Sequence, residues 1–580
     1  MFTYVSEQLG VSPDQIKVVF LLVISVPLSL VFPHLPSSDT SIVPHLVAAL
    51  PSIVFFTVIL DNLRWGLVQL VMDSVATWLI VKWGVKTKQG RMMPWIVFVV
   101  AMGHLTLNNI NTFVHKVDRD NIEITGSQMV LCMKLISFAW SVYDGQQPDA
   151  ELDATQRSTK ISKVPGIIPF LGYTLFFPSV LAGPSFSYSA YQAWTSHALF
   201  KKESEADKQK TWPRTSRSLI PDGRRRKAVK RLVTGLAYLA VYSVYSWTFA
   251  YDRMLEPTFL AKVWYQRIGF MQIAGFIART KYYAVWCIAE SAYILSGLGF
   301  NPRTGHYDAS RNVRIRTIEL APNFKILLDS WNINTNIWLR ECIYKRVTKK
   351  GKKPGFQSTQ ITFMTSALWH GVNPCYLMTF VLGGFYQSIG RLLRALVRPF
   401  FLPPGSVPPP KSFKTPTPAQ NDPKTMKPAQ SSAPPAKTPP PPQTPLKWAY
   451  DVAGIIVTQL ALNFAVAPFM LLSVRASWQA WRVVYFYGLA MAALPLLVFN
   501  LGLARHLKRT LRRRDEKAAA RAATEDEKKQ LQWEQRYEGE RERKRLARME
   551  SGIPSIAPDV ERMMEEEKRQ AESPEGKKEL

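Results

Sequence analysis

The chain alternates between long apolar runs and short polar connections over about its first 500 residues, and is mostly polar after them. Runs of about 18 to 25 apolar residues match the hydrocarbon thickness of a bilayer when they form helices. This pattern predicts an all-α polytopic membrane protein with about ten or eleven transmembrane helices. The expected spans lie near residues 16–33, 42–60, 66–84, 92–107, 165–182, 229–250, 268–299, 375–392, 449–473 and 481–503.

The run at 268–299 is the least regular, because Arg279, Lys281 and Glu290 interrupt it. It is either two shorter elements or one long helix that faces protein rather than lipid. At the start of the chain, the apolar run does not have the flanks of a signal peptide, so we expect the first span to be retained.

Polar segments divide the chain into four expected parts. Residues 401–447 are rich in Pro with scattered Lys, Ser and Thr, which favours an extended, disordered linker without a core. Residues 1–400 form the main membrane domain, and 448–504 add two helices that complete it. Residues 505–580 are a charged, solvated tail.

The formal net charge of +30 lies in connections between apolar runs, not along one soluble face. This distribution indicates cytosolic loops and not a nucleic-acid partner. Residues 201–231 carry twelve Lys and Arg against four acidic residues, and 345–353 carry no acid at all. With the basic linker also cytosolic, the last two spans return the C-terminus to the cytosol. Lys577-Lys578-Glu579-Leu580 is similar to a dilysine retrieval signal, which predicts the endoplasmic reticulum membrane.

Two segments place an amide, a histidine and several aromatic rings in apolar surroundings: 330–340 and 366–371. His370 is a functional candidate because ionisable residues at membrane depth are costly. The alternative is a neutral histidine that donates to a helix carbonyl. Asn332 is open to a similar alternative, since asparagines often tie membrane helices together at about 0.6 kcal/mol per bond.

The spacing of the residues around Asn332 predicts one stripe on a helix. Positions three and four residues apart share a helix face, and this stripe would end at a cation and the basic loop. It would join an amide, an apolar wall and a positively charged mouth. Its members are Trp331, Asn332, Thr335, Trp338, Leu339 and Arg340.

These segments resemble the signature of the membrane-bound O-acyltransferase superfamily, in particular its fungal lysophospholipid acyltransferase branch. Further segments resemble that branch in the expected order, over about residues 10 to 400 and the last two spans. One departure follows the histidine, where the branch often reads His-Gly-x-x-Pro-Gly-Tyr-Tyr but Cys375, Tyr376 and Leu377 follow Pro374 here. That departure leaves acyl-chain and head-group preference open. The other matching segments are 129–135, 183–188, 264–267 and 289–293.

The resemblance implies transfer of a fatty acyl group from acyl-coenzyme A to the free hydroxyl of lysophospholipids. The reaction would take place in a chamber inside the membrane domain and serve phospholipid synthesis and remodelling. Lyso-PC, lyso-PE, lyso-PA and lyso-PS are the expected acceptors. His370 would be the general base, since a histidine can accept a proton at neutral pH. Asn332 would stabilise the oxyanion, or orient the histidine or the substrate.

Direct transfer needs no covalent intermediate, because a thioester is already activated. We expect no bound metal or resident cofactor, with acyl-coenzyme A as co-substrate. The residues expected to contact the substrates are Trp331, Thr335, Trp338, Trp369 and Glu290. Those expected to bind the coenzyme A phosphates are Arg340, Lys345 and Arg346, whose alternative role is that of ordinary cytosolic anchors.

Other functions remain as alternatives. The acceptor could instead be a sterol, a diacylglycerol or a protein, or the chain could be a non-catalytic member of the superfamily. A multipass lipid transporter would use Glu290 and His370 along its pathway, but transporters often contain two related halves and no such repeat is visible. A homo-oligomer is compatible with the sequence.

Overall fold

The computed structural model describes residues 2–9, 12–87, 89–115, 122–201, 220–348, 355–403 and 444–550. Within these residues the secondary structure is helical, apart from one isolated bridge between Asn301 and His306. The predicted all-α class is therefore confirmed. Nearly all of the expected linker, most of the polar part of 201–231 and the dilysine-like signal lie outside the described residues.

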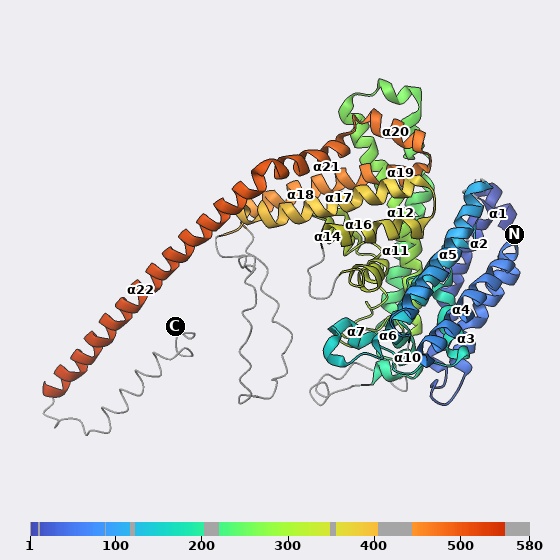
Figure 1. Ribbon diagram of the computed structural model, residues 1–580, viewed down its shortest axis with the longest axis horizontal. Coiled ribbons are helices and arrows are strands. Elements are labelled where there is room, and N and C mark those ends of the chain that lie inside the picture. The colour runs from blue at the N-terminus through green and yellow to red at the C-terminus, as the bar shows by residue number, and fades with distance from the viewer. Residues whose placement is uncertain are drawn as a thin grey trace. The chain divides into compact units, whose positions relative to one another are not determined.

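Figure 1 shows the helices along the chain. Their bounds are α1 Phe2–Leu9, α2 Pro13–Leu28, α3 Val43–Val54, α4 Arg64–Lys86, α5 Met93–Val114, α6 Thr125–Asp144, α7 Ala154–Thr159, α8 Ile167–Thr174, α9 Phe177–Val180, α10 Tyr188–Thr195, α11 Arg224–Tyr245, α12 Trp264–Ser296, α13 Ile315–Glu319, α14 Phe324–Leu328, α15 Ile333–Trp338, α16 Phe356–His370, α17 Pro374–Leu396, α18 Pro445–Ala465, α19 Ala467–Leu471, α20 Val474–Val483, α21 Tyr487–Val498 and α22 Ala504–Glu550.

The chain forms two compact units. The first comprises Met1–Phe401 and Gln443–Ala504, and the second comprises Leu402–Pro442 and Arg505–Leu580. The apolar helices belong to the first unit. In the second unit, α22 is polar on all sides and carries pairs of opposite charge one turn apart, such as Arg512 and Glu516.

Five helical segments among the described residues are long and apolar enough to cross a membrane, and they match five of the expected runs. The predicted total of ten or eleven spans stays a prediction. The five segments are Pro13–His34, Asp61–Lys86, Met93–Val114, Pro445–Leu471 and Tyr487–Lys544, the last of which continues into the polar tail.

The structure corrects one expected span and decides between the alternatives for another. The run at 165–182 is not one helix, because α8 ends at Thr174 and a new, short helix begins at Phe177, with Pro178 in its first turn. The irregular run at 268–299 lies in one helix, α12, whose second half is almost wholly buried. It therefore faces protein, and the charged residues that interrupt it have protein partners.

Helix α6 was not expected as a span, yet most of its side chains are buried. Gln128, Lys134 and Asp144 lower its hydropathy, which explains why the apolar pattern missed it. The Lys134 ammonium donates to the carbonyls of Tyr173 and Thr174 and to the Ser179 hydroxyl at 2.7 to 3.2 Å. Helix α6 contacts both α15 and the turn that follows it, so this buried helix is the support of the candidate site.

Candidate active site

Asn332 lies just before α15, in the left-handed backbone region with φ 42° and ψ 57°. Asparagine tolerates this region better than most side chains. The predicted continuous stripe is therefore wrong: Trp331 and Asn332 precede the helix, and a π-helical turn begins at Leu339. Trp331 packs instead against the rings of α12, with its centroid 5.1 Å from that of Trp286. Thr335 and Trp338 remain on α15.

Asn312 fixes the position of Asn332. Its backbone carbonyl accepts from the Ile333 N–H at 2.9 Å. Its side-chain oxygen accepts from the Asn334 backbone N–H at 3.1 Å, and its Nδ2 donates to Asn332 Oδ1 at 3.0 Å. Thr335 Oγ1 also donates to Asn332 Oδ1, at 2.9 Å. Asn312 is 1% exposed, so these bonds are shielded from water.

This network determines which way the Asn332 amide faces. A backbone N–H can only donate, so the Asn312 atom beside the Asn334 N–H must be oxygen. The other end of the Asn312 amide is then a donor, and the Asn332 atom beside it must be Oδ1. Among the described residues no acceptor binds Asn332 Nδ2. The free NH₂ group of Asn332 is therefore a preorganised hydrogen-bond donor.

His370 is the last residue of α16, and aromatic rings surround it. Its ring stacks on Phe380 of α17 at 5.0 Å between centroids and meets Phe469 edge to face at 5.0 Å. Within the described ranges no hydrogen bond joins the imidazole to protein, and the residue keeps part of its surface exposed. The structure thus shows no helix carbonyl as its partner, and its nitrogens are available to a ligand.

Short contacts connect the two candidate segments. Trp338 of α15 and Trp369 of α16 lie 5.9 Å apart between ring centroids. Trp369 Nε1 donates to the Met129 carbonyl of α6 at 2.9 Å, and Thr335 Oγ1 lies 3.2 Å from Met133 Sδ of the same helix. Two turns of α6 therefore hold both segments. That Asn332 and His370 face one cavity stays a prediction.

The residues predicted to contact the substrates differ in whether their polar side-chain atoms already have a hydrogen-bond partner in the protein. Trp369 and Thr335 use their polar atoms inside the protein. The indole nitrogen of Trp338 is buried and has no acceptor in the described part of the chain. An unpaired buried donor is costly unless a ligand satisfies it. Trp338 is therefore the best placed of the three to donate to a substrate.

Glu290 of α12 is fully buried and pairs with Arg231 of α11, and Arg311 lies 3.9 Å from its other oxygen. This favours the alternative in which the carboxylate balances nearby arginines. Arg311 directly precedes Asn312, so the pair anchors the segment that positions Asn332. Among the described residues no hydrogen bond or ion pair joins Glu290 to Asn332 or His370.

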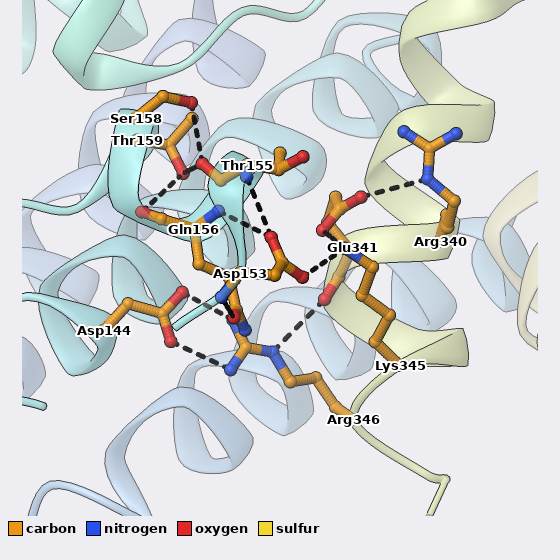
Figure 2. Close-up of polar contacts among 10 residues, drawn as sticks. All are labelled: Asp144, Asp153, Thr155, Gln156, Ser158, Thr159, Arg340, Glu341, Lys345 and Arg346. Atoms are coloured by element: carbon orange, nitrogen blue, oxygen red, sulfur yellow. Dashed lines mark hydrogen bonds and ion pairs between the residues drawn. The ribbon is translucent and has the colours of Figure 1, made fainter. Parts of the chain in front are cut away.

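The three cations expected to bind phosphates all have acidic partners (Figure 2). Arg346 forms a two-pronged pair with Asp144 at 2.6 and 2.9 Å. Lys345 bonds Asp153 at 2.6 Å and also Glu341. Burial alone would raise the pKa of Asp153, but bonds from Lys345 and backbone N–H groups lower it below its usual range. Arg340 pairs with its sequence neighbour Glu341 at 3.0 Å, and its side chain, 46% exposed, is the most accessible of the three.

Replacing Arg346 with alanine is expected to destabilise the protein by about 3–5 kcal/mol, because it leaves a buried carboxylate unpaired. The Asp144 side chain is 3% exposed, and Arg346 also stacks on Trp140 at 4.2 Å. The thermal midpoint of the purified protein in detergent measures this. Arg340→Ala is the matched control and should change the midpoint little. Equal thermal midpoints for the two variants would contradict the conclusion that Arg346 stabilises the fold.

Sequence reasoning missed Asn312 and Lys134. Asn312 stands among charged residues of a connection, and no spacing links it to Asn332, 20 residues later. A lysine inside an apolar run is a visible signal at Lys134, since such a residue needs buried partners.

Comparison with known proteins identifies the family. Residues 92–410 match the model of MBOAT, the membrane-bound O-acyltransferase family. The "Lysophospholipid acyltransferase" of Schizosaccharomyces pombe is 34% identical over 88% of this chain and 91% of its own length. The protein of the same name from Saccharomyces cerevisiae is 32% identical over 86% and 76%. Human "Membrane-bound glycerophospholipid O-acyltransferase 2" is 27% identical over 71% and 72%. The resemblance seen in the sequence is confirmed, and this membrane protein belongs to the membrane-bound O-acyltransferase family.

Proposed function

We propose that this acyltransferase moves a fatty acyl group from acyl-coenzyme A to the free hydroxyl of lysophospholipids with several head groups. The observation that carries the proposal is the free amide donor of Asn332, held by Asn312, in a chain that also presents the unbonded ring of His370. The names of the two yeast relatives support the acceptor class.

In the proposed reaction, His370 accepts the proton of the acceptor hydroxyl as its oxygen attacks the thioester carbonyl carbon. Asn332 Nδ2 donates to the oxygen on which negative charge develops. The intermediate then collapses with cleavage of the carbon–sulfur bond, and the coenzyme A thiolate recovers the proton from His370. These two side chains supply the proton transfer and the charge stabilisation, so the proposal includes no metal and no acyl-enzyme.

The remaining parts of the proposal concern placement. Arg340 is the first candidate for the coenzyme A phosphates, because Lys345 and Arg346 already pair with Asp153 and Asp144.

We place the protein in the endoplasmic reticulum membrane with its C-terminus in the cytosol. The support for this is the distribution of basic residues and the C-terminal Lys577-Lys578-Glu579-Leu580.

An acceptor panel tests the proposed reaction. Membranes containing the protein receive labelled oleoyl-coenzyme A and, in parallel, lyso-PC, lyso-PE, lyso-PA, lyso-PS, cholesterol or diacylglycerol. We expect label in the diacyl phospholipids only. Label in a sterol ester or triacylglycerol would move the activity to another acceptor class, and label in no product from folded protein would favour transport.

Asn312→Ala is expected to lower kcat roughly tenfold to 100-fold with little change in KM, because it releases the Asn332 amide from its fixed orientation. Asn312→Asp is the more specific test of the hydrogen bond to Asn332. It keeps an acceptor for the Asn334 N–H but cannot donate to Asn332. Steady-state kinetics of both variants measure the effect.

The matched control for these variants is Asn301→Ala, which removes an asparagine bonded to Asp308 in the same connection. It should leave kcat near that of the unaltered protein. If Asn312→Asp is folded and fully active, the orientation of Asn332 does not depend on Asn312.

A further inference from the structure

A groove lies among α14, α17, α18 and α21. Its volume is about 730 Å³, and its lining is mostly apolar. Tyr386 and Ile389 of α17, each 5% exposed, form its floor. Val457 of α18 and Leu494 of α21, 49% and 58% exposed, stand at its open rim. Figure 1 shows these three helices running beside one another.

Arginines stand at one end of this groove. Arg394 and Arg398 both line it, four residues apart and partly buried. Neither forms an ion pair with a carboxylate among the described residues. Lys447 also lines this end, but its charge is balanced by Asp451. The end therefore carries two guanidinium groups without a direct ion pair beside an apolar trough, and Asp329 acts on Arg394 only from beyond ion-pair distance.

The dimensions of the groove match one leaflet of a bilayer. Tyr386 and Arg394, both on α17, are eight residues apart, about 12 Å at 1.5 Å per residue, and Arg398 lies just beyond the end of the helix at Leu396. The hydrocarbon core is about 30 Å thick, so one leaflet measures roughly 15 Å. Helices α18 and α21 belong to segments apolar enough to cross the membrane. We therefore expect the apolar trough to open to lipid chains, with the two arginines toward a head group.

We infer that this groove binds an anionic glycerophospholipid of the surrounding bilayer. One acyl chain lies along Tyr386, Ile389 and Val457, and the phosphate accepts hydrogen bonds from Arg394 and Arg398. Guanidinium groups bind phosphate oxygens in this way, often two at a time. A net negative head group supplies the direct ionic partner that neither guanidinium has among the described residues.

The bound lipid is distinct from both proposed substrates, which react at the candidate active site. Asn332, Trp338 and His370 do not line the groove. The inference therefore does not rest on the proposed acyl transfer, and a failure of one leaves the other standing.

Native mass spectrometry of the full chain in detergent tests the site, with dioleoylphosphatidylserine, dioleoylphosphatidylcholine and oleoyl-coenzyme A titrated separately. The variants are Arg394→Gln/Arg398→Gln, which removes both charges, and Val457→Trp, which places a bulky ring at the rim and narrows the trough. The matched control is Arg505→Gln/Arg509→Gln, which removes two exposed arginines with the same spacing from α22.

We expect the serine lipid to bind more tightly than the choline lipid. Its affinity should fall roughly 10- to 30-fold in the double groove variant, because each arginine near an anionic lipid contributes to binding. Val457→Trp should also weaken binding, and the α22 variant should not. Equal affinities for the two lipids, or unchanged serine-lipid binding in both groove variants, would overturn the inference. An oleoyl-coenzyme A affinity that falls while serine-lipid binding stays would assign the groove to the acyl donor instead.

Discussion

Replacing His370 with alanine is expected to lower acyl transfer roughly 100- to 10,000-fold, the usual contribution of a positioned general base. An alcohol is a weak nucleophile, and the described structure leaves the His370 ring without a protein hydrogen bond that would occupy it. Loss of the ring removes the proton acceptor but leaves the amide donor of Asn332 in place. The turnover of oleoyl-coenzyme A with lyso-PC in membranes measures the effect.

Two controls separate chemistry from packing in this experiment. His370→Gln keeps a polar side chain against Phe380 and Phe469 but cannot accept a proton at neutral pH, so it should be as inactive as the alanine variant. His115→Ala removes an exposed histidine and should retain activity. A folded His370→Ala protein with full activity would show that another group is the base.

Loss of the Asn332 amide is expected to lower kcat about 100- to 1,000-fold, the usual effect of removing one oxyanion donor. Glycine is the better replacement, because alanine would also strain the left-handed backbone at φ 42°. Asn332→Gly removes the donor and keeps the turn. KM for the acceptor should change little, since the donor acts mainly in the transition state.

Asn332→Asp provides the second half of this test. It keeps an oxygen for the bonds from Asn312 and Thr335 but places an acceptor where the NH₂ group was. This variant should be no more active than the glycine variant. An active Asn332→Asp protein would mean that Asn332 orients its neighbours and does not donate to the oxyanion.

The apolar pattern predicted the helical class and five helices long enough to cross a membrane, because bilayer thickness sets helix length directly. It was wrong at 165–182, where the helix is interrupted between Thr174 and Phe177, and it missed α6, whose buried Lys134 and Asp144 reduce its hydropathy. Contacts inside the protein satisfy those charges. A hydropathy pattern treats every span as facing lipid and cannot anticipate such contacts.

The candidate site was predictable by residue type but not by arrangement. Helical spacing placed Asn332 on α15, whereas Asn312 and the Asn334 N–H hold it before the helix in the left-handed region. The three cations Arg340, Lys345 and Arg346 were visible, but Lys345 and Arg346 also have partners far away in sequence. Asp144, which binds Arg346, is 202 residues earlier. Such pairs depend on tertiary packing that no local pattern contains.

The most direct measurement is an experimental structure of the protein with lyso-PC and a ketone analogue of oleoyl-coenzyme A, in which CH₂ replaces the thioester sulfur. We expect Asn332 Nδ2 within about 3 Å of the analogue's carbonyl oxygen. The His370 ring should lie within hydrogen-bond reach of the lyso-PC hydroxyl on the other side of that carbonyl. A carbonyl bound away from both side chains, or Asn332 and His370 facing separate cavities, would contradict the proposed reaction.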